Sequence, residues 1–248
     1  IAGIGVSVVS LAGLMQMLLS DYPVQTWAFF FGLIVASSIF ILRGISGWKA
    51  LDGGLLALGV VLGVTVCTLS PTQTPDALWF IFLSGAIAIC AMILPGISGS
   101  FILLILGKYQ YIMGAISGLT TGENFSQNLV IIAVFLVGAV CGILGFSKFL
   151  HWLLARWNKE TLIVLAGFII GSLVKVWPWS NAEAIVCSQN PELALMAENL
   201  EGGLPAELVS QYMASADLHI AGAVVFALIG FSLVTGVEIV GKMLAKKS

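Results

Sequence analysis

The stretch Leu94-Pro95-Gly96-Ile97-Ser98-Gly99-Ser100 carries the residue types most suited to chemistry, and it interrupts an apolar run from Ala77 to Leu106. Pro95 removes a backbone donor and disfavours helix at the preceding residue, while the two glycines allow backbone angles that other residues resist. Ser100 stands where an N-cap would stand, ahead of a second apolar helix. We therefore predict a broken helix whose new start presents unpaired N–H groups and a positive dipole end. These two features together favour an anion.

The predicted substrate-binding residues belong to this break and to the segment that follows it. They are Pro95, Gly96, Ser98, Gly99, Ser100 and Lys108. The serine hydroxyls can donate hydrogen bonds to a phosphate, but they can equally cap the helix or bond back to its first turn. The Lys108 ammonium can reach a phosphate as a point charge, or it can extend to the outer interface. A simple kink remains the alternative for the whole stretch.

Two charged residues outside the break are candidates for coupling or for steering the ligand. Glu238 precedes Lys242 by four residues, so it is predicted either to form an ion pair within its helix or to carry a coupled proton. Arg43 follows an apolar run, where it can attract anionic headgroups or anchor the inner end of the helix. The four cysteines lack metal-binding spacing, and no catalytic residue, metal or cofactor is predicted.

Composition places these residues in a membrane. The chain is 59% hydrophobic and 9% charged, with a mean hydropathy of +1.08. A soluble domain carries about a quarter charged residues, so the chain is predicted to be an all-α polytopic membrane protein with no nucleic-acid partner. The strand-length alternation of a membrane barrel is absent from the sequence.

Several apolar runs are long enough to cross or nearly cross a bilayer, which needs about 20 helical residues. They are residues 1–19, 24–42, 53–69, the interrupted region 77–119, 129–154, 162–177 and 220–244. Basic residues follow the runs that end near residues 42, 154 and 244, whereas residues 180–217 carry acidic residues and neither lysine nor arginine. The positive-inside rule then places the acidic segment outside the cell. This scheme requires an even number of crossings in residues 77–119, and we favour a re-entrant hairpin over two full crossings.

A weak internal repeat has an offset of 135 residues, which places Gly32 on Gly167 and Ser37 on Ser172. The charge pattern orients the two copies oppositely, which predicts an inverted-topology repeat of the kind that many transporters have. The predicted organisation is the remainder of a first repeat with a connecting helix (residues 1–76), a second repeat with the re-entrant segment (77–179), an acidic extracytoplasmic loop (180–218) and a final helix (219–248). The counterpart of the break would lie upstream of Ile1, so the sequence is expected to be part of a longer protein.

The sequence resembles one family of bacterial and archaeal membrane proteins, the polyprenyl-phosphate transporters. That family carries two copies of a Pro-Gly-[Val/Ile]-Ser-Gly-[Gly/Ser] signature, each followed by an apolar stretch and Gly-x-Tyr. Residues Pro95 to Ser100, Phe101 to Leu106 and Gly107-Lys108-Tyr109 match the second copy. The segment Tyr22-Pro23 with Phe29 to Ile34 is similar to the segment after the first copy, whose signature is absent here.

The resemblance implies a multi-pass protein of the inner (cytoplasmic) membrane. Its implied activity moves undecaprenyl phosphate from the outer to the inner leaflet, so that the carrier lipid can be reused in cell-wall synthesis. Residues alone indicate only an anionic ligand. An alternative of another class is an intramembrane serine hydrolase of rhomboid type, because Gly96-Ile97-Ser98-Gly99 resembles a nucleophile setting and His219 opens a later helix. That alternative leaves Pro95 and the repeat unexplained.

Overall fold

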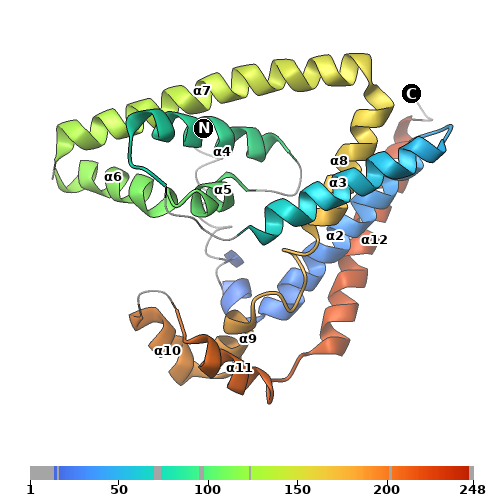
Figure 1. Cartoon of the computed structure of the whole chain (residues 1–248). Helices are drawn as coiled ribbons and strands as arrows, with labels where there is room; N and C mark the ends of the chain where they lie inside the picture. Colours follow the sequence, from blue (N-terminus) through green and yellow to red (C-terminus); the bar gives the residue numbers. More distant parts are fainter. Residues whose placement is uncertain are drawn as a thin grey trace. The chain divides into compact units, whose positions relative to one another are not determined.

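A computed structural model describes residues 14–15, 17–69, 74–94, 98–122, 124–200 and 203–245, and the regular structure in these ranges is helical (Figure 1). The helices are α2 (Pro23–Arg43), α3 (Ala50–Thr68), α4 (Leu78–Ile93), α5 (Gly99–Ile105), α6 (Tyr109–Thr121), α7 (Phe125–Arg156), α8 (Asn158–Ser172), α9 (Ala182–Gln189), α10 (Pro191–Asn199), α11 (Ala206–Met213) and α12 (Ile220–Ala245). The predicted all-α class is confirmed.

Four helices are long and apolar enough to cross a membrane, and they correspond to α2, α3, α7 and α12. The α4 helix is apolar but has only 16 residues, and the pair α5 and α6 is bent by 110° at the short break between the two helices. The run predicted at residues 162–177 forms α8, which begins earlier, at Asn158, and ends at Ser172. Pro178 disfavours helix at Trp177, and turns occupy residues 173–175.

The chain divides into two compact units, residues 41–172 and residues 1–40 with 173–248. In the first unit, glycines hold α3 against α8 and α4 against α7 at close range. A Cβ on Gly63 of α3 would lie 2.5 Å from the carbonyl oxygen of Phe168, and one on Gly142 of α7 would lie 2.6 Å from that of Ala86. Small residues of this kind let helix backbones approach closely within lipid.

The second unit contains most of α2, together with α9 to α12. Here Gly32 of α2 faces the backbone of Ala227 in α12, and Gly230 of α12 faces the backbone of Phe29 in α2. The acidic segment between residues 180 and 217 is folded into the short helices α9, α10 and α11 (Figure 1). Their shared core consists of Val186, Leu193 and Leu204.

The inverted repeat stays a prediction. The helices that its offset relates are α2 and α8, and each presents a glycine, Gly32 or Gly167, to the backbone of another helix. Most of the run that would lead the first copy, residues 1–13, lies outside the described residues.

Candidate functional site: a re-entrant helical hairpin

The helix that enters the predicted break is α4, which ends at Ile93, and the chain becomes helical again at Gly99. Leu94 already has extended backbone angles (φ −76°, ψ 127°), as expected before a proline. The broken helix that the sequence predicts is therefore confirmed. Pro95 and Gly96, two of the predicted ligand residues, lie outside the described residues, as does Ile97.

The new helix is capped by Ser98 rather than by Ser100. Ser98 has extended backbone angles, and its Oγ accepts a hydrogen bond from Phe101 N at 3.1 Å. The predicted cap, Ser100, is wrong by two residues, because both serines precede the apolar run and the sequence does not distinguish them. The Oγ atoms of Ser98 and Ser100 lie 2.9 Å apart, and both residues are exposed. The break thus brings two hydroxyls together at the first turn of α5.

Backbone donors at this helix start are limited to its first residues. Ile102 N donates to Ser98 O at 3.2 Å, which is the first backbone hydrogen bond of the turn. The N–H groups of Gly99 and Ser100 precede that bond, so they lie where a helix has no intrahelical acceptor to offer them. Phe101 N and Ile102 N already donate to Ser98, so the donors left for an anion here are the N–H groups of Gly99 and Ser100 and the serine hydroxyls.

Gly99 fits tightly against the preceding helix. A Cβ at this position would lie 2.8 Å from Met92 Cγ and 2.9 Å from Ala88 O, both in the second half of α4. The start of α5 therefore packs directly against α4. Further along, Ala91 of α4 forms a small buried cluster with Ile102 and Ile105 of α5.

The end of α5 is shaped by Gly107. Its φ of +64° is left-handed, and the N–H groups of Gly107 and Lys108 donate to Leu104 O and Leu103 O at 2.9 and 2.8 Å. This pair of bonds is a Schellman motif, in which glycine avoids the strain that a Cβ would bring. The glycine of Gly107-Lys108-Tyr109 is thus explained by backbone geometry.

Lys108 is buried, with a relative exposure of 1%. Its Nζ pairs with Asp76 Oδ1 at 2.5 Å and donates to Thr74 O at 2.8 Å, and it lies 5.7 Å and 5.4 Å from the ring centres of Phe80 and Tyr111. Sequence reasoning did not assign Thr74 or Asp76 to the site. Their only signal was a short polar segment at the start of the interrupted region, more than 30 residues before Lys108.

These contacts define the path of the segment. Thr74 precedes α4, and its Oγ1 donates to Leu106 O at the end of α5, beside the pair between Asp76 and Lys108. The segment that precedes α4 and the end of α5 therefore lie side by side. The seven residues of α5 span roughly 10 Å, which is too short for a membrane crossing. Helices α4 and α5 form a hairpin at the position of the predicted re-entrant segment, with the serines at its tip and Lys108 at its base.

The remaining predicted residues lie elsewhere. Glu238 forms an ion pair with Lys242, four residues later, at 3.2 Å. Arg43 is the last residue of α2 and is exposed. These contacts match the simpler of the two alternatives for Glu238, and its coupling role stays a prediction.

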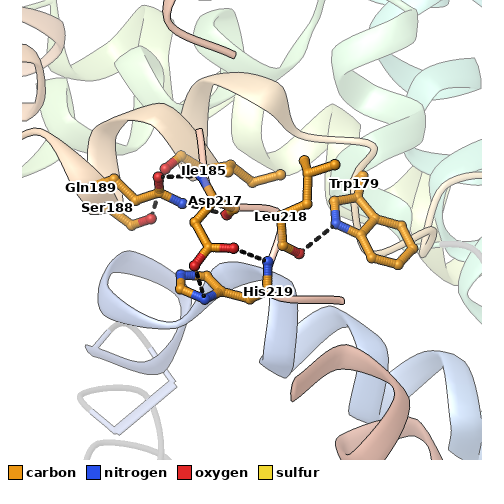
Figure 2. Close-up of polar contacts among 7 residues, drawn as sticks. All are labelled: Trp179, Ile185, Ser188, Gln189, Asp217, Leu218 and His219. Carbon is orange, nitrogen blue, oxygen red and sulfur yellow. Dashed lines mark hydrogen bonds and ion pairs between the residues drawn. The ribbon is translucent and has the colours of Figure 1, made fainter. Parts of the chain in front are cut away.

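His219 belongs to a strap, residues 217–219, that leads into α12 (Figure 2). Asp217 Oδ1 accepts from His219 N at 2.9 Å, and its other oxygen lies 3.2 Å from His219 Nδ1. Gln189 pairs with the backbone of Asp217 through two hydrogen bonds, and Trp179 Nε1 donates to Leu218 O. The described partner of the His219 imidazole is Asp217 in this strap, and those of the Ser98 hydroxyl belong to the first turn of α5.

An apolar pocket of about 340 Å³ opens between the tip of the hairpin and the corner that joins α7 to α8. Leu94 contributes from the end of α4, and the walls include Phe149, Leu153, Val164 and Leu165. Glu160 and the hydroxyl-bearing Thr161 are its polar lining residues. Among the described residues, no group of His, Cys, Asp and Glu side chains could hold a metal ion.

Comparison with known proteins finds two relatives that carry the same name. A polyprenyl-phosphate transporter of Vibrio cholerae serotype O1 is 38% identical over 95% of this chain and 73% of its own length. A polyprenyl-phosphate transporter of Staphylococcus aureus is 31% identical over 72% of the chain and 66% of its own length. No solved structure matches significantly.

A family model agrees with these relatives, which are named as transporters rather than enzymes. The model, described as VCA0040-like, undecaprenyl phosphate translocase-like, matches residues 1–193. It covers the re-entrant hairpin, the apolar pocket and the helices that hold them. The predicted family resemblance is therefore confirmed, and the prediction of a transporter rather than an enzyme agrees with it. The chain belongs to the undecaprenyl phosphate translocase-like family.

Proposed function

We propose that this protein carries a polyprenyl phosphate, specifically undecaprenyl phosphate, from the outer to the inner leaflet of the cytoplasmic membrane. The returned lipid would serve again as a carrier in cell-wall synthesis. The observation that carries the proposal is the re-entrant hairpin, whose tip presents two hydroxyls and a helix start within an apolar protein. Broken helices of this kind bind substrate in other transporters. The names of the relatives support a polyprenyl phosphate as the ligand, and the description of the family model supports undecaprenyl phosphate.

The phosphate is proposed to bind at the tip of the hairpin. The hydroxyls of Ser98 and Ser100 and the N–H groups of Gly99 and Ser100 would donate to its oxygens, and Pro95 and Gly96 are proposed to belong to the same site. Short hydrogen bonds to a charged acceptor are stronger than those between neutral groups. This arrangement would recognise phosphate through donors that converge on its oxygens, and it would leave the hydrocarbon chain outside the polar site.

The prenyl chain is proposed to occupy the apolar pocket beside Leu94. This residue immediately precedes the break, so the pocket begins next to the proposed phosphate site. Its walls are aliphatic and aromatic side chains of α7 and α8, such as Phe149 and Leu165, which suit a branched hydrocarbon. Arg43 would attract the anionic headgroup at the inner face, and Glu238 would couple a proton to transport.

Leaflet exchange in proteoliposomes tests this function. An impermeant phosphatase added outside hydrolyses polyprenyl phosphate of the outer leaflet at once, and the remainder only as fast as it is carried across. We expect wild-type protein to accelerate the slow phase, and Ser98→Ala with Ser100→Ala to slow it about a hundredfold, because each hydrogen bond to the charged phosphate contributes about 1.5–3 kcal/mol. Ser147→Ala is the matched control, since Ser147 bonds only within its own helix in the described structure.

Two results would contradict the proposal. Wild-type proteoliposomes that exchange lipid no faster than empty liposomes would remove the function. Normal exchange by the double serine variant would remove the tip of the hairpin as the phosphate site.

A further inference from the structure

Lys108 presents an unusual combination of burial and charge. Its side chain is the largest fully buried one in the described part of the chain, and its ammonium contacts a carboxylate, a carbonyl oxygen and the faces of two aromatic rings. A buried ammonium requires a counter-charge, because removing it from water costs several kcal/mol. The rings of Phe80 and Tyr111 contribute by cation–π attraction but carry no net charge. Asp76 is thus the balancing group.

The two members of this pair differ greatly in exposure. The side chain of Asp76 is 62% exposed, against 1% for Lys108. Solvent therefore reaches the carboxylate while the ammonium stays covered. An anion that approaches this end of the hairpin meets Asp76 first, and it can take the carboxylate's place if that group swings outward. The buried ammonium then keeps one negative partner throughout.

The geometry separates this place from the tip of the hairpin. Lys108 follows α5 and Ser98 precedes it, so the length of α5, roughly 10 Å, lies between them. The ammonium is directed to Thr74 and Asp76 at the base. A phosphate on Lys108 would therefore be in a different position from a phosphate on the serines.

We propose that Asp76 is a displaceable counter-ion, and that the lipid phosphate takes its place on Lys108 in a first binding position at the base of the hairpin. The inference rests on the proposed function and adds a step to it, in which the headgroup binds at the base before it reaches the tip. Asp76 competes with the phosphate for one ammonium. The fraction of protein with Lys108 available then sets the apparent affinity for the lipid.

The competition gives the substitutions opposite effects. Asp76→Asn removes the competitor and leaves Lys108 without a counter-charge, so this variant should bind undecaprenyl phosphate about tenfold more tightly than wild type does. The lipid should therefore raise the melting temperature of the variant by more than it raises that of wild type. Lys108→Gln should bind the lipid more weakly than wild type, and the double variant should resemble Lys108→Gln. Asp76→Glu keeps the charge and should resemble wild type. The measurement is lipid binding and thermal unfolding of the whole chain in detergent micelles, with undecaprenol as the uncharged probe.

Asp52→Asn is the matched control. Among the described residues of 41–172, Asp52 forms the other close ion pair with a lysine, with Lys159 Nζ at 2.5 Å. Its removal should lower the melting temperature without increasing the response to lipid. If Asp76→Asn protein unfolds during purification, added undecaprenyl phosphate should recover it, and should not recover Asp52→Asn protein.

The outcomes separate this inference from the proposed function. Lipid binding by Asp76→Asn equal to or weaker than that of wild type would mean that Asp76 only fastens the hairpin. The proposed replacement of Asp76 by the phosphate would then be wrong, whereas the proposed transport function would stand. An equal gain with undecaprenol would also overturn it, because the phosphate would then play no part. Absence of both lipid binding and leaflet exchange in wild type would overturn the proposed function itself.

Discussion

Gly99 has a steric role that is separate from the ligand. Methionine side chains rotate easily, so the approach to Met92 can be relieved, but the carbonyl oxygen of Ala88 belongs to the backbone of α4. Any side chain at residue 99 therefore pushes the first turn of α5 away from α4. The sequence indicates that glycine is needed in the break. It does not show whether the missing side chain makes room for a phosphate or for the neighbouring helix.

We expect Gly99→Val to impair the protein more than Ser98→Ala does. Overpacking against α4 should lower the free energy of unfolding by about 1–3 kcal/mol, and the displaced turn should slow leaflet exchange as well. Loss of the Ser98 cap costs about 1 kcal/mol and leaves the backbone donors in place. Thermal unfolding and the phosphatase assay measure both effects.

Gly114→Ala provides the control, because a Cβ at Gly114 in α6 would meet nothing within 4 Å beyond its chain neighbours and the nearby backbone of its own helix. Alanine in that helix should be neutral or stabilising by up to about 1 kcal/mol. A Gly99→Val protein with the melting temperature and exchange rate of wild type would contradict the packing of α5 against α4.

At the level of elements, the sequence predicts the pieces of the hairpin better than their arrangement. Proline, glycine and serine mark where α4 must end and where α5 can begin, because these residues act on the local backbone. The return of the chain depends on contacts from Thr74 and Asp76 to residues more than 30 positions later, and no local pattern encodes such pairs. The same limit applies to the α7–α8 corner, whose apolar pocket arises only when the two helices pack.

The pocket can be filled by a single substitution. Leu153→Trp should occupy much of the space beside Leu94, so we expect it to slow exchange of long polyprenyl phosphates severalfold. Exchange of a short prenyl phosphate should change little, because its chain need not enter the pocket. Leu144→Trp is the control, since Leu144 lies on the same helix, is 58% exposed and does not line the pocket. Equal slowing for both chain lengths, or by both variants, would mean that the prenyl chain lies elsewhere.

At the level of the whole molecule, each unit has a lysine that contacts residues near the end of α2, and the grouping of basic residues on one side of the membrane stays a prediction. In residues 41–172, the Lys159 ammonium near the start of α8 reaches Gly47 O and Asp52, at the start of α3. In the other unit, Lys242 of α12 lies over the ring of Phe40, three residues before α2 ends at Arg43. The lysines of α8 and α12 thus each contact residues close to Arg43 in the chain. The positions of lysine and arginine in the chain are enough to predict which loops are cytoplasmic, whereas the inverted repeat requires a comparison of whole copies.

Topology can be tested directly with cysteine labels. Helix α12 has 26 residues and spans roughly 39 Å, enough to cross the bilayer, so its two ends should lie on opposite sides. The strap of residues 217–219 ties the start of α12 to Trp179 and Gln189, beside the acidic helices.

In a chain whose cysteines Cys67, Cys90, Cys141 and Cys187 are replaced by alanine, Glu192→Cys should react with an impermeant maleimide applied to intact cells. Met243→Cys should react only after permeabilisation. The reverse pattern, or reaction of both from one side, would contradict the proposed orientation, and with it the outer-to-inner direction that places Lys108 before Ser98 on the path of the lipid.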